Sequence, residues 1–307
     1  MDDRFRPWPG SGRVLLFFIA CAVLLASIAP IERQFPGLPT GLFTGAVTSI
    51  GTLVLTVVFV RWEGLTLEDV GGSVGRRSPL RFAIGFLLGL LLVALHTSIV
   101  GFASDVRWVR SESVSFLDIA TSLIIYFLLS CREELAFHGY PLRRLNSFFG
   151  LWVAQFIVAM VFAVEHVAGG ATWTQAIFGA GVGSLLFGMA AIATRGLAVP
   201  IGLHAAWNFG DWMRGGKGSW GFWRPIGIDH ADRAEMISYL VVMLSATLAF
   251  WWMHRLVTLR SRCIAILTAS VMMTISAKIR TVRNNTYRSR ATISIVPSDF
   301  AKDSTES

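Results

Sequence analysis

Residues 119–140 read IATSLIIYFLLSCREELAFHGY, and this stretch decides the architecture of the chain. An apolar run from Ile119 to Cys131, of a kind that a lipid bilayer accepts, leads directly into the adjacent carboxylates of Glu133 and Glu134. Because hydrocarbon solvates a charge poorly, an ionisable group in such a run is by default a candidate for a functional site. The stretch therefore predicts a membrane helix that carries a buried polar site.

Two apolar segments further along the chain also carry isolated polar residues. His166 ends the run VFAVEH, and His204 and Asn208 lie in the run LHAAWN. Residues four apart share one face of an α-helix, so His204 and Asn208 project together, as do Glu134 and His138. We predict that the three stretches meet in one buried site.

The composition excludes an ordinary soluble protein. Of the 307 residues, 54% are apolar and only 15% are charged, and apolar windows long enough to cross the bilayer recur along the chain. Three scattered cysteines, Cys21, Cys131 and Cys263, form neither a disulfide framework nor a metal-binding spacing. These features predict an all-α, polytopic membrane protein in contact with the lipid bilayer.

The apolar windows predict about eight transmembrane helices with the site inside the bundle. Their approximate ranges are 14–29, 41–60, 82–102, 116–137, 151–166, 176–193, 197–209 and 236–253. Gly139 and Pro141 should bend or end the fourth helix, and 140–148 should be an interfacial segment. The predicted divisions are an N-terminal cytoplasmic lead, an intramembrane domain and a basic, disordered tail, at 1–13, 14–258 and 259–307.

The net charge of +8 reports membrane topology, and we expect no nucleic-acid partner. With the N-terminus in the cytoplasm, 20 Lys and Arg residues fall on the inner side and 7 on the outer side. Arg132, Arg143 and Arg144 are counted as inner residues, and the last two as interfacial anchors. The bias predicts a multi-pass protein of the plasma membrane with both termini in the cytoplasm. Oligomeric state is not predicted.

The polar residues supply the parts for peptide hydrolysis without a covalent intermediate. A carboxylate in a partly wet apolar cavity can deprotonate a water, and His166 can share that water. His204 and Asn208 offer two hydrogen-bond donors for a developing oxyanion. A metal is an equally compatible alternative, because Glu133 or Glu134, His166 and His204 offer ligands that Zn²⁺ accepts.

Three motifs in this order resemble those of the CAAX-type intramembrane protease and bacteriocin-processing family. They are the sequences EELAFHG at 133–139, FAVEH at 162–166 and HAAWN at 204–208. The resemblance covers about residues 62–210 and implies an eight-helix membrane protease, glutamic or metal-dependent, that acts on prenylated or bacteriocin-like substrates. It implies that Glu133 and His166 activate water and that His204 and Asn208 stabilise the oxyanion, with Glu134 beside them.

The chain departs from the family at His138, where an arginine is usual. An arginine would hold Glu134 as a permanent ion pair, whereas a histidine does so only while protonated. His138 is therefore predicted to support Glu134 or, alternatively, to add a metal ligand.

Two functions compete with proteolysis. The same polar residues could line the path of a transporter or proton relay, or the fold could serve as a non-catalytic immunity or scaffold protein. Other polar residues in the apolar runs have simpler explanations. We predict that His96 is a packing residue and that the tryptophans at 207, 212, 220 and 223 form an interfacial belt.

Overall fold

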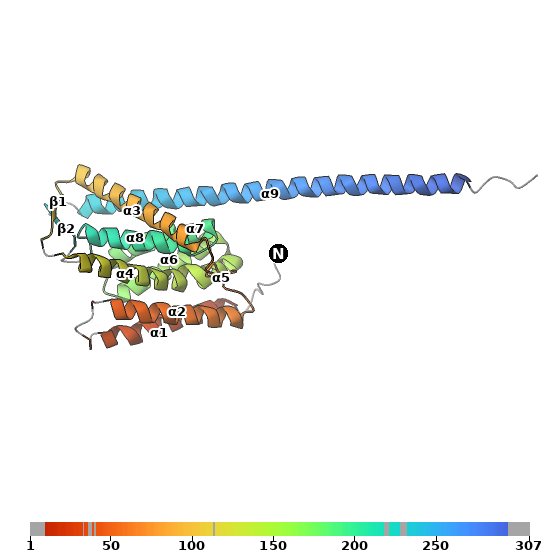
Figure 1. Ribbon diagram of the computed structural model, residues 1–307. Coiled ribbons are helices and arrows are strands. Elements are labelled where there is room, and N and C mark those ends of the chain that lie inside the picture. Colours follow the sequence, from red (N-terminus) through yellow and green to blue (C-terminus); the bar gives the residue numbers. More distant parts are fainter. Residues whose placement is uncertain are drawn as a thin grey trace, which may run out of the picture. The chain divides into compact units, whose positions relative to one another are not determined.

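The computed structural model describes residues 10–32, 34, 35, 39, 41–112, 114–217, 221–227 and 232–293. The chain divides into two compact units, Met1–His254 and Arg255–Ser307, and all sites discussed below lie in the first. Figure 1 shows this first unit as a layered bundle of helices. Its elements are α1 (Gly10–Glu32), α2 (Leu42–Trp62), α3 (Ser78–Ala103), β1 (Arg107–Arg110), α4 (Phe116–Glu133), the π-helix η1 (Glu134–Gly139), α5 (Tyr140–Phe149), α6 (Leu151–Ala168), the π-helix η2 (Gln175–Gly181), α7 (Val182–Thr194), α8 (Ala198–Met213), β2 (Trp223–Ile226) and the first part of α9 (Asp232–Ile293).

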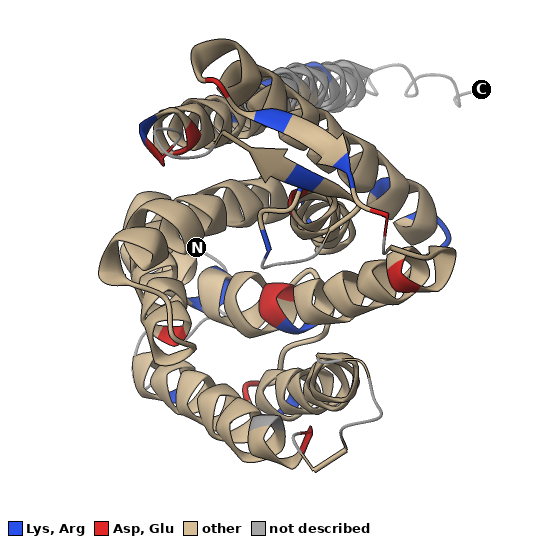
Figure 2. Cartoon of the chain, turned by 90° about the vertical axis from the view of Figure 1, so that its left-hand side faces the viewer, with Lys and Arg blue, Asp and Glu red and all other residues tan. Residues whose placement is uncertain are grey.

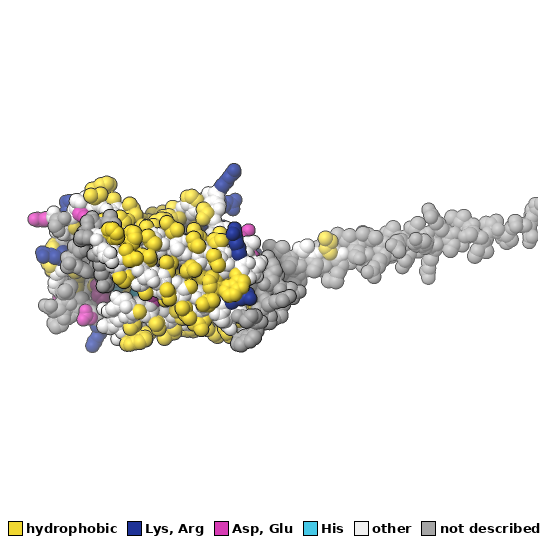
Figure 3. All heavy atoms as spheres, turned by 90° about the horizontal axis from the view of Figure 1, so that it is seen from below, with side chains coloured by type: hydrophobic (Ala, Val, Ile, Leu, Met, Phe, Trp, Pro, Cys, Tyr) yellow, Lys and Arg dark blue, Asp and Glu magenta, His cyan; other side chains and the backbone are white. Residues whose placement is uncertain are grey.

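The predicted all-α membrane architecture is confirmed. Within the described residues, six helices are long and apolar enough to cross a bilayer: α1, α2, α3, α6, η2 with α7, and Asp232–Ser261 of α9. The other two predicted spans correspond to α4 with η1, which carries the first motif, and to α8, which carries the third. The predicted interfacial segment is α5. Hydrophobic side chains cover the middle of the face seen in Figure 3.

A two-stranded sheet occupies segments that the sequence predicted as loops. β1 and β2 pair antiparallel, with Arg107 opposite Ile226 and Arg110 opposite Trp223. Figure 2 looks at the bundle from the end where these strands lie. Strands of four residues give almost no periodic signal in a sequence, which explains why they were not predicted.

Glycines bring α3 and α8 into close contact. Gly85 and Gly89 of α3 face the backbone of α8, at Val199 and Leu203, and a Cβ at either glycine would collide with it. Small residues allow membrane helices to approach in this way. The contact fixes α8, which carries His204 and Asn208, between α3 and α4.

A buried ion cluster ties α1, α2 and α5 together. The Glu63 carboxylate pairs with Arg144, accepts a hydrogen bond from the Tyr140 hydroxyl at 2.9 Å, and lies 3.8 Å from Arg13. The interpretation of Arg144 as an interfacial anchor is therefore wrong, because its side chain is only 4% exposed and has a carboxylate partner.

The tail differs from the sequence expectation over its described part. A disordered segment was predicted from residue 259, whereas α9 continues as a helix to Ile293. Residues 259–293 contain neither glycine nor proline, so nothing in the sequence interrupts a helix there. The remaining residues of the predicted tail, and residues 1–9 of the predicted lead, lie outside the described part of the chain.

Candidate active site

The two glutamates lie where one helix changes its winding. α4 begins with a capping box, in which Ser115 and Asp118 bond each other's backbone amides, and it ends at Glu133. The chain continues directly as the π-helix η1 and then, after Gly139, as α5. Gly139 has non-helical dihedral angles, so the predicted interruption at this glycine is confirmed. Single π-helical turns are frequent at functional sites because they redirect side chains.

The turn at Gly150 brings the first and second motifs to the same depth. Glu133 precedes Gly150 by about as many residues as His166 follows it, and α5 and α6 run back along each other from that turn. The helical path of α4 therefore continues well past the glutamates and does not end beside them.

Glu134 is the fully buried carboxylate of the pair. Its Oε2 lies 2.8 Å from Nδ1 of His138, and its Oε1 lies 2.8 Å from Nδ1 of His204. Nε2 of His138 lies 3.0 Å from the hydroxyl of Ser184. Both oxygens of Glu134 are thus used to hold histidines, and none of its surface is exposed. This geometry suits a positioning group better than a proton acceptor for water.

Glu133 retains access that Glu134 lacks, with 12% of its side chain exposed. Its Oε1 accepts a hydrogen bond from Arg132 at 2.7 Å, and its Oε2 lies 3.4 Å from Nε2 of His204. It also lies within electrostatic range of His166. His204 therefore bridges the two glutamates and stacks on the ring of Phe187, with centroids 4.0 Å apart.

Arg132 joins Glu133 to a third carboxylate. Its other amino nitrogen lies 2.7 Å from Glu165, which directly precedes His166. The side chain of Arg132 is only 6% exposed, so counting it as an inner topological charge was wrong. The sequence contained a signal for this role, because Arg132 is itself a charge at the end of an apolar run.

A cavity of about 440 Å³ joins the second and third motifs. Its walls include His166, His204 and Asn208. Glu133 and Glu134 are not among the lining residues, but both contact His204. Nδ1 of His166 lies 2.9 Å from the carbonyl oxygen of Phe162, to which it can donate, and this leaves Nε2 for the cavity. The side-chain amide of Asn208 has no hydrogen-bond partner among the described residues. The structure thus groups all the predicted site residues around one cavity, with the glutamates one layer deeper.

The metal alternative finds no ready ligand group. No set of three His, Cys, Asp or Glu side chains among the described residues is grouped so that it could hold a metal ion. Both ring nitrogens of His204 face carboxylates, and one of the nitrogens of His166 faces a backbone carbonyl. The residues as placed do not fit a three-ligand site, so we derive no step through a metal.

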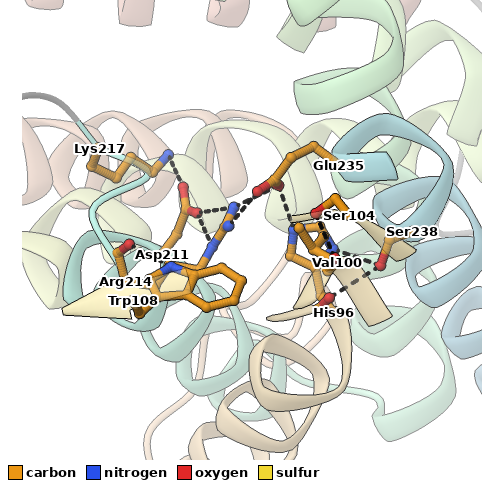
Figure 4. A network of polar contacts seen from close by, with 9 residues as sticks. All are labelled: His96, Val100, Ser104, Trp108, Asp211, Arg214, Lys217, Glu235 and Ser238. Atoms are coloured by element: carbon orange, nitrogen blue, oxygen red, sulfur yellow. Dashed lines mark hydrogen bonds and ion pairs between the residues drawn. The ribbon is translucent and has the colours of Figure 1, made fainter. Parts of the chain in front are cut away.

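A second polar network, which the sequence did not predict, borders the same cavity (Figure 4). Arg214 forms two hydrogen bonds with Glu235 and one with Asp211, at 2.8, 3.0 and 2.9 Å. His96 contacts Glu235 through Nε2 at 3.0 Å and Ser238 through Nδ1 at 2.9 Å. His96 is therefore buried, as a packing residue would be, but it also joins α3 to α9 at the cavity wall.

Burial opposes the charge of Arg214, but the neighbouring carboxylates of Asp211 and Glu235 outweigh it and raise the pKa of Arg214. Arg214 therefore remains a cation at the border of the cavity.

The predicted tryptophan belt is wrong in part at this end of the bundle. Trp207 and Trp212 are buried, Trp223 is exposed, and Trp220 lies outside the described residues.

The part of the chain from α4 to α8, which contains all three motifs, also matches a known family. Residues 115–210 match the model of a protease family, the type II CAAX prenyl endopeptidase Rce1-like proteins. The matched segment runs from the cap of α4 into α8 and contains all three motifs. The predicted relationship to CAAX-type intramembrane proteases is confirmed over this segment, which is shorter than the expected 62–210. The chain has no significant match among curated proteins.

Proposed function

We propose that this protein is an intramembrane endopeptidase that hydrolyses membrane-associated peptides, including prenylated ones. The observation that carries the proposal is the carboxylate–histidine chain Glu134–His204–Glu133, with His204 forming part of the wall of a cavity that also contains His166 and Asn208. The family match supports the same reaction class. The proposed location is the plasma membrane, with both termini in the cytoplasm.

In the proposed reaction, Glu133 is the base and His166 positions the water. If Nδ1 of His166 carries its proton toward Phe162, Nε2 can accept a hydrogen bond from the water. The water oxygen attacks the peptide carbonyl carbon while its proton passes to Glu133. Glu133 then returns that proton to the leaving amine nitrogen, and the C–N bond breaks.

His204 and Asn208 would stabilise the oxyanion. Nε2 of His204 faces the Glu133 carboxylate at 3.4 Å before the reaction. When Glu133 takes up a proton it loses its negative charge, and its hold on that N–H weakens. The donor then becomes available to the carbonyl oxygen at the moment when negative charge develops there. Glu134 keeps the other ring nitrogen fixed throughout, at 2.8 Å.

The function is tested by comparing membrane proteomes from cells that express the wild-type protein, Glu133→Ala or His166→Ala. We expect peptides from one or a few membrane proteins to be shortened only with the wild-type protein, because each variant lacks one of the groups that activate water. Identical proteomes in all three strains would contradict the proposal. If cells that express Glu133→Ala behave like cells that express the wild-type protein, this would favour the non-catalytic immunity or scaffold function.

The His138→Arg substitution separates the two roles predicted for His138. His138 contacts Glu134 and Ser184. In general a histidine forms an ion pair with a carboxylate only while it is protonated. An arginine keeps its charge, so we expect cleavage to fall by no more than about tenfold at neutral pH and to decline less at alkaline pH.

The measurement is a pH profile of cleavage together with the metal content of the purified protein. If His138 is a metal ligand, arginine removes a lone pair that the metal needs, and activity and metal disappear together. That joint loss would contradict the ion-pair role. Treatment of the wild-type protein with a chelator gives an independent measure of whether a metal is required.

A further inference from the structure

A second cavity shares no lining residue with the first. It has a volume of about 290 Å³ and is formed by α2, α4, α8 and the connection between α2 and α3. Leu53, Leu128, Leu135 and Ile201 contribute to its apolar wall, and Cys131 lies among them. Leu53 belongs to α2, which is long and apolar enough to cross a bilayer, and at that depth the available apolar occupant is a hydrocarbon chain.

We call this second cavity the groove. One of its walls is a polar turn rich in glycine and arginine. Residues 71–78 read GGSVGRRS, and five of them, at 71–74 and 78, line the groove. Arg76 and Arg77 are exposed within the turn. Neither has a carboxylate within 4 Å among the residues that the structure describes. The groove therefore combines an apolar wall with an uncompensated positive turn.

Arg143 contacts the same turn, and Arg81 lies near it. A Cβ placed on Gly71 would lie 2.8 Å from Nη2 of Arg143. A Cβ placed on Gly196 would lie 3.7 Å from Nη1 of Arg81 and 3.8 Å from the carbonyl oxygen of Gly71. Arg143 donates a hydrogen bond to the carbonyl oxygen of Ala191 at 2.8 Å, and within the described part of the chain it has no ion pair. Burial lowers the pKa of Arg143 to about 10, yet the group remains a cation at neutral pH. Positive charge is therefore concentrated at this turn, and among the described residues Arg76, Arg77 and Arg143 have no carboxylate within 4 Å.

We propose that this groove binds an anionic phospholipid of the surrounding membrane. One acyl chain lies along the apolar wall between α2, α4 and α8, and the phosphate lies at the turn 71–78 beside Arg76 and Arg77. Basic residues at the membrane surface attract anionic headgroups, and the apolar groove supplies the contact that fixes a single lipid. Because Cys131 and Leu135 line the groove, the lipid supports the segment that presents Glu133 and Glu134 from behind.

The test uses the full-length protein in detergent, stripped of lipid and then equilibrated with equal amounts of phosphatidylglycerol and phosphatidylcholine. Native mass spectrometry should show one lipid retained per chain, with a preference for phosphatidylglycerol. In the Arg76→Gln, Arg77→Gln double variant we expect this preference to fall by about tenfold. The matched control is Arg107→Gln with Arg233→Gln, two exposed arginines outside the turn, and it should keep the preference.

Cys131 reports whether the lipid lies in the groove. Phosphatidylglycerol should slow alkylation of Cys131 by N-ethylmaleimide, with exposed Cys263 as an internal control for reagent activity. In Leu53→Trp the larger side chain fills part of the groove, so this variant should retain less lipid. The proposal is overturned if the wild type shows no headgroup preference, if both arginine pairs lose it equally, or if the lipid leaves Cys131 alkylation unchanged. None of these measurements depends on proteolysis.

Discussion

Replacing Glu133 by glutamine is expected to reduce the rate of peptide cleavage by about 10²–10⁴-fold, the range that a positioned acid–base group contributes. Glutamine has nearly the same shape and can still accept the hydrogen bond that Arg132 donates at 2.7 Å. It cannot take a proton from water. The variant should therefore bind substrate and fold normally, and the loss should appear in kcat and not in KM.

The matched control for this experiment is Glu112→Gln, which makes the same chemical change at an exposed position. Cleavage of a substrate identified from the membrane proteomes is followed with purified wild-type protein and both variants. Thermal unfolding in the same detergent verifies that the folded state is retained. Activity of Glu133→Gln within a few-fold of wild type would exclude Glu133 as the base and would direct attention to His166.

Much of the bundle could be predicted because apolar windows and turn residues mark the helices directly. Ser115 and Asp118 form the capping box at which α4 begins, and Gly150 separates α5 from α6. The sequence predicted a helix to residue 137, but it could not show that its last turn is a π-helix that leads directly into α5, because a π-helical turn has no clear residue pattern. It also gave no indication of the sheet formed by β1 and β2, whose pairing depends on segments more than 100 residues apart.

The residue spacing predicted the candidate site. The site residues that the sequence prediction missed share one physical cause. His204 with Asn208 and Glu134 with His138 lie one helical turn apart, so helical geometry alone places each pair on one face. Ser184, Arg132 and Glu165 reach the site through contacts between helices, which a single sequence does not reveal. Arg132 was counted as a charge of the inner side because positive residues at the ends of spans usually lie in the cytoplasm. A buried pair of carboxylates overrides that preference.

Replacing Arg132 by glutamine should have the largest effect on stability. The Arg132 guanidinium lies between two carboxylates, Glu133 and Glu165, whose side chains are 12% and 16% exposed. Removing the cation leaves two poorly solvated negative charges without their partner. Breaking a buried ion pair in this way costs about 3–5 kcal/mol in the free energy of unfolding. Cleavage should also fall sharply, because Glu133 loses the group that orients it.

The same reasoning predicts that neutralising all three groups restores stability without restoring activity. In the triple variant Arg132→Gln, Glu133→Gln, Glu165→Gln no buried charge remains unpaired, so the unfolding free energy should return to within about 1–2 kcal/mol of wild type. Arg61→Gln, at an exposed arginine with no ion pair within the described part of the chain, serves as the control and should change little. Unfolding is measured by denaturant titration in detergent, alongside cleavage. If Arg132→Gln is as stable as Arg61→Gln, the three charges do not form the buried network that holds Glu133 in place.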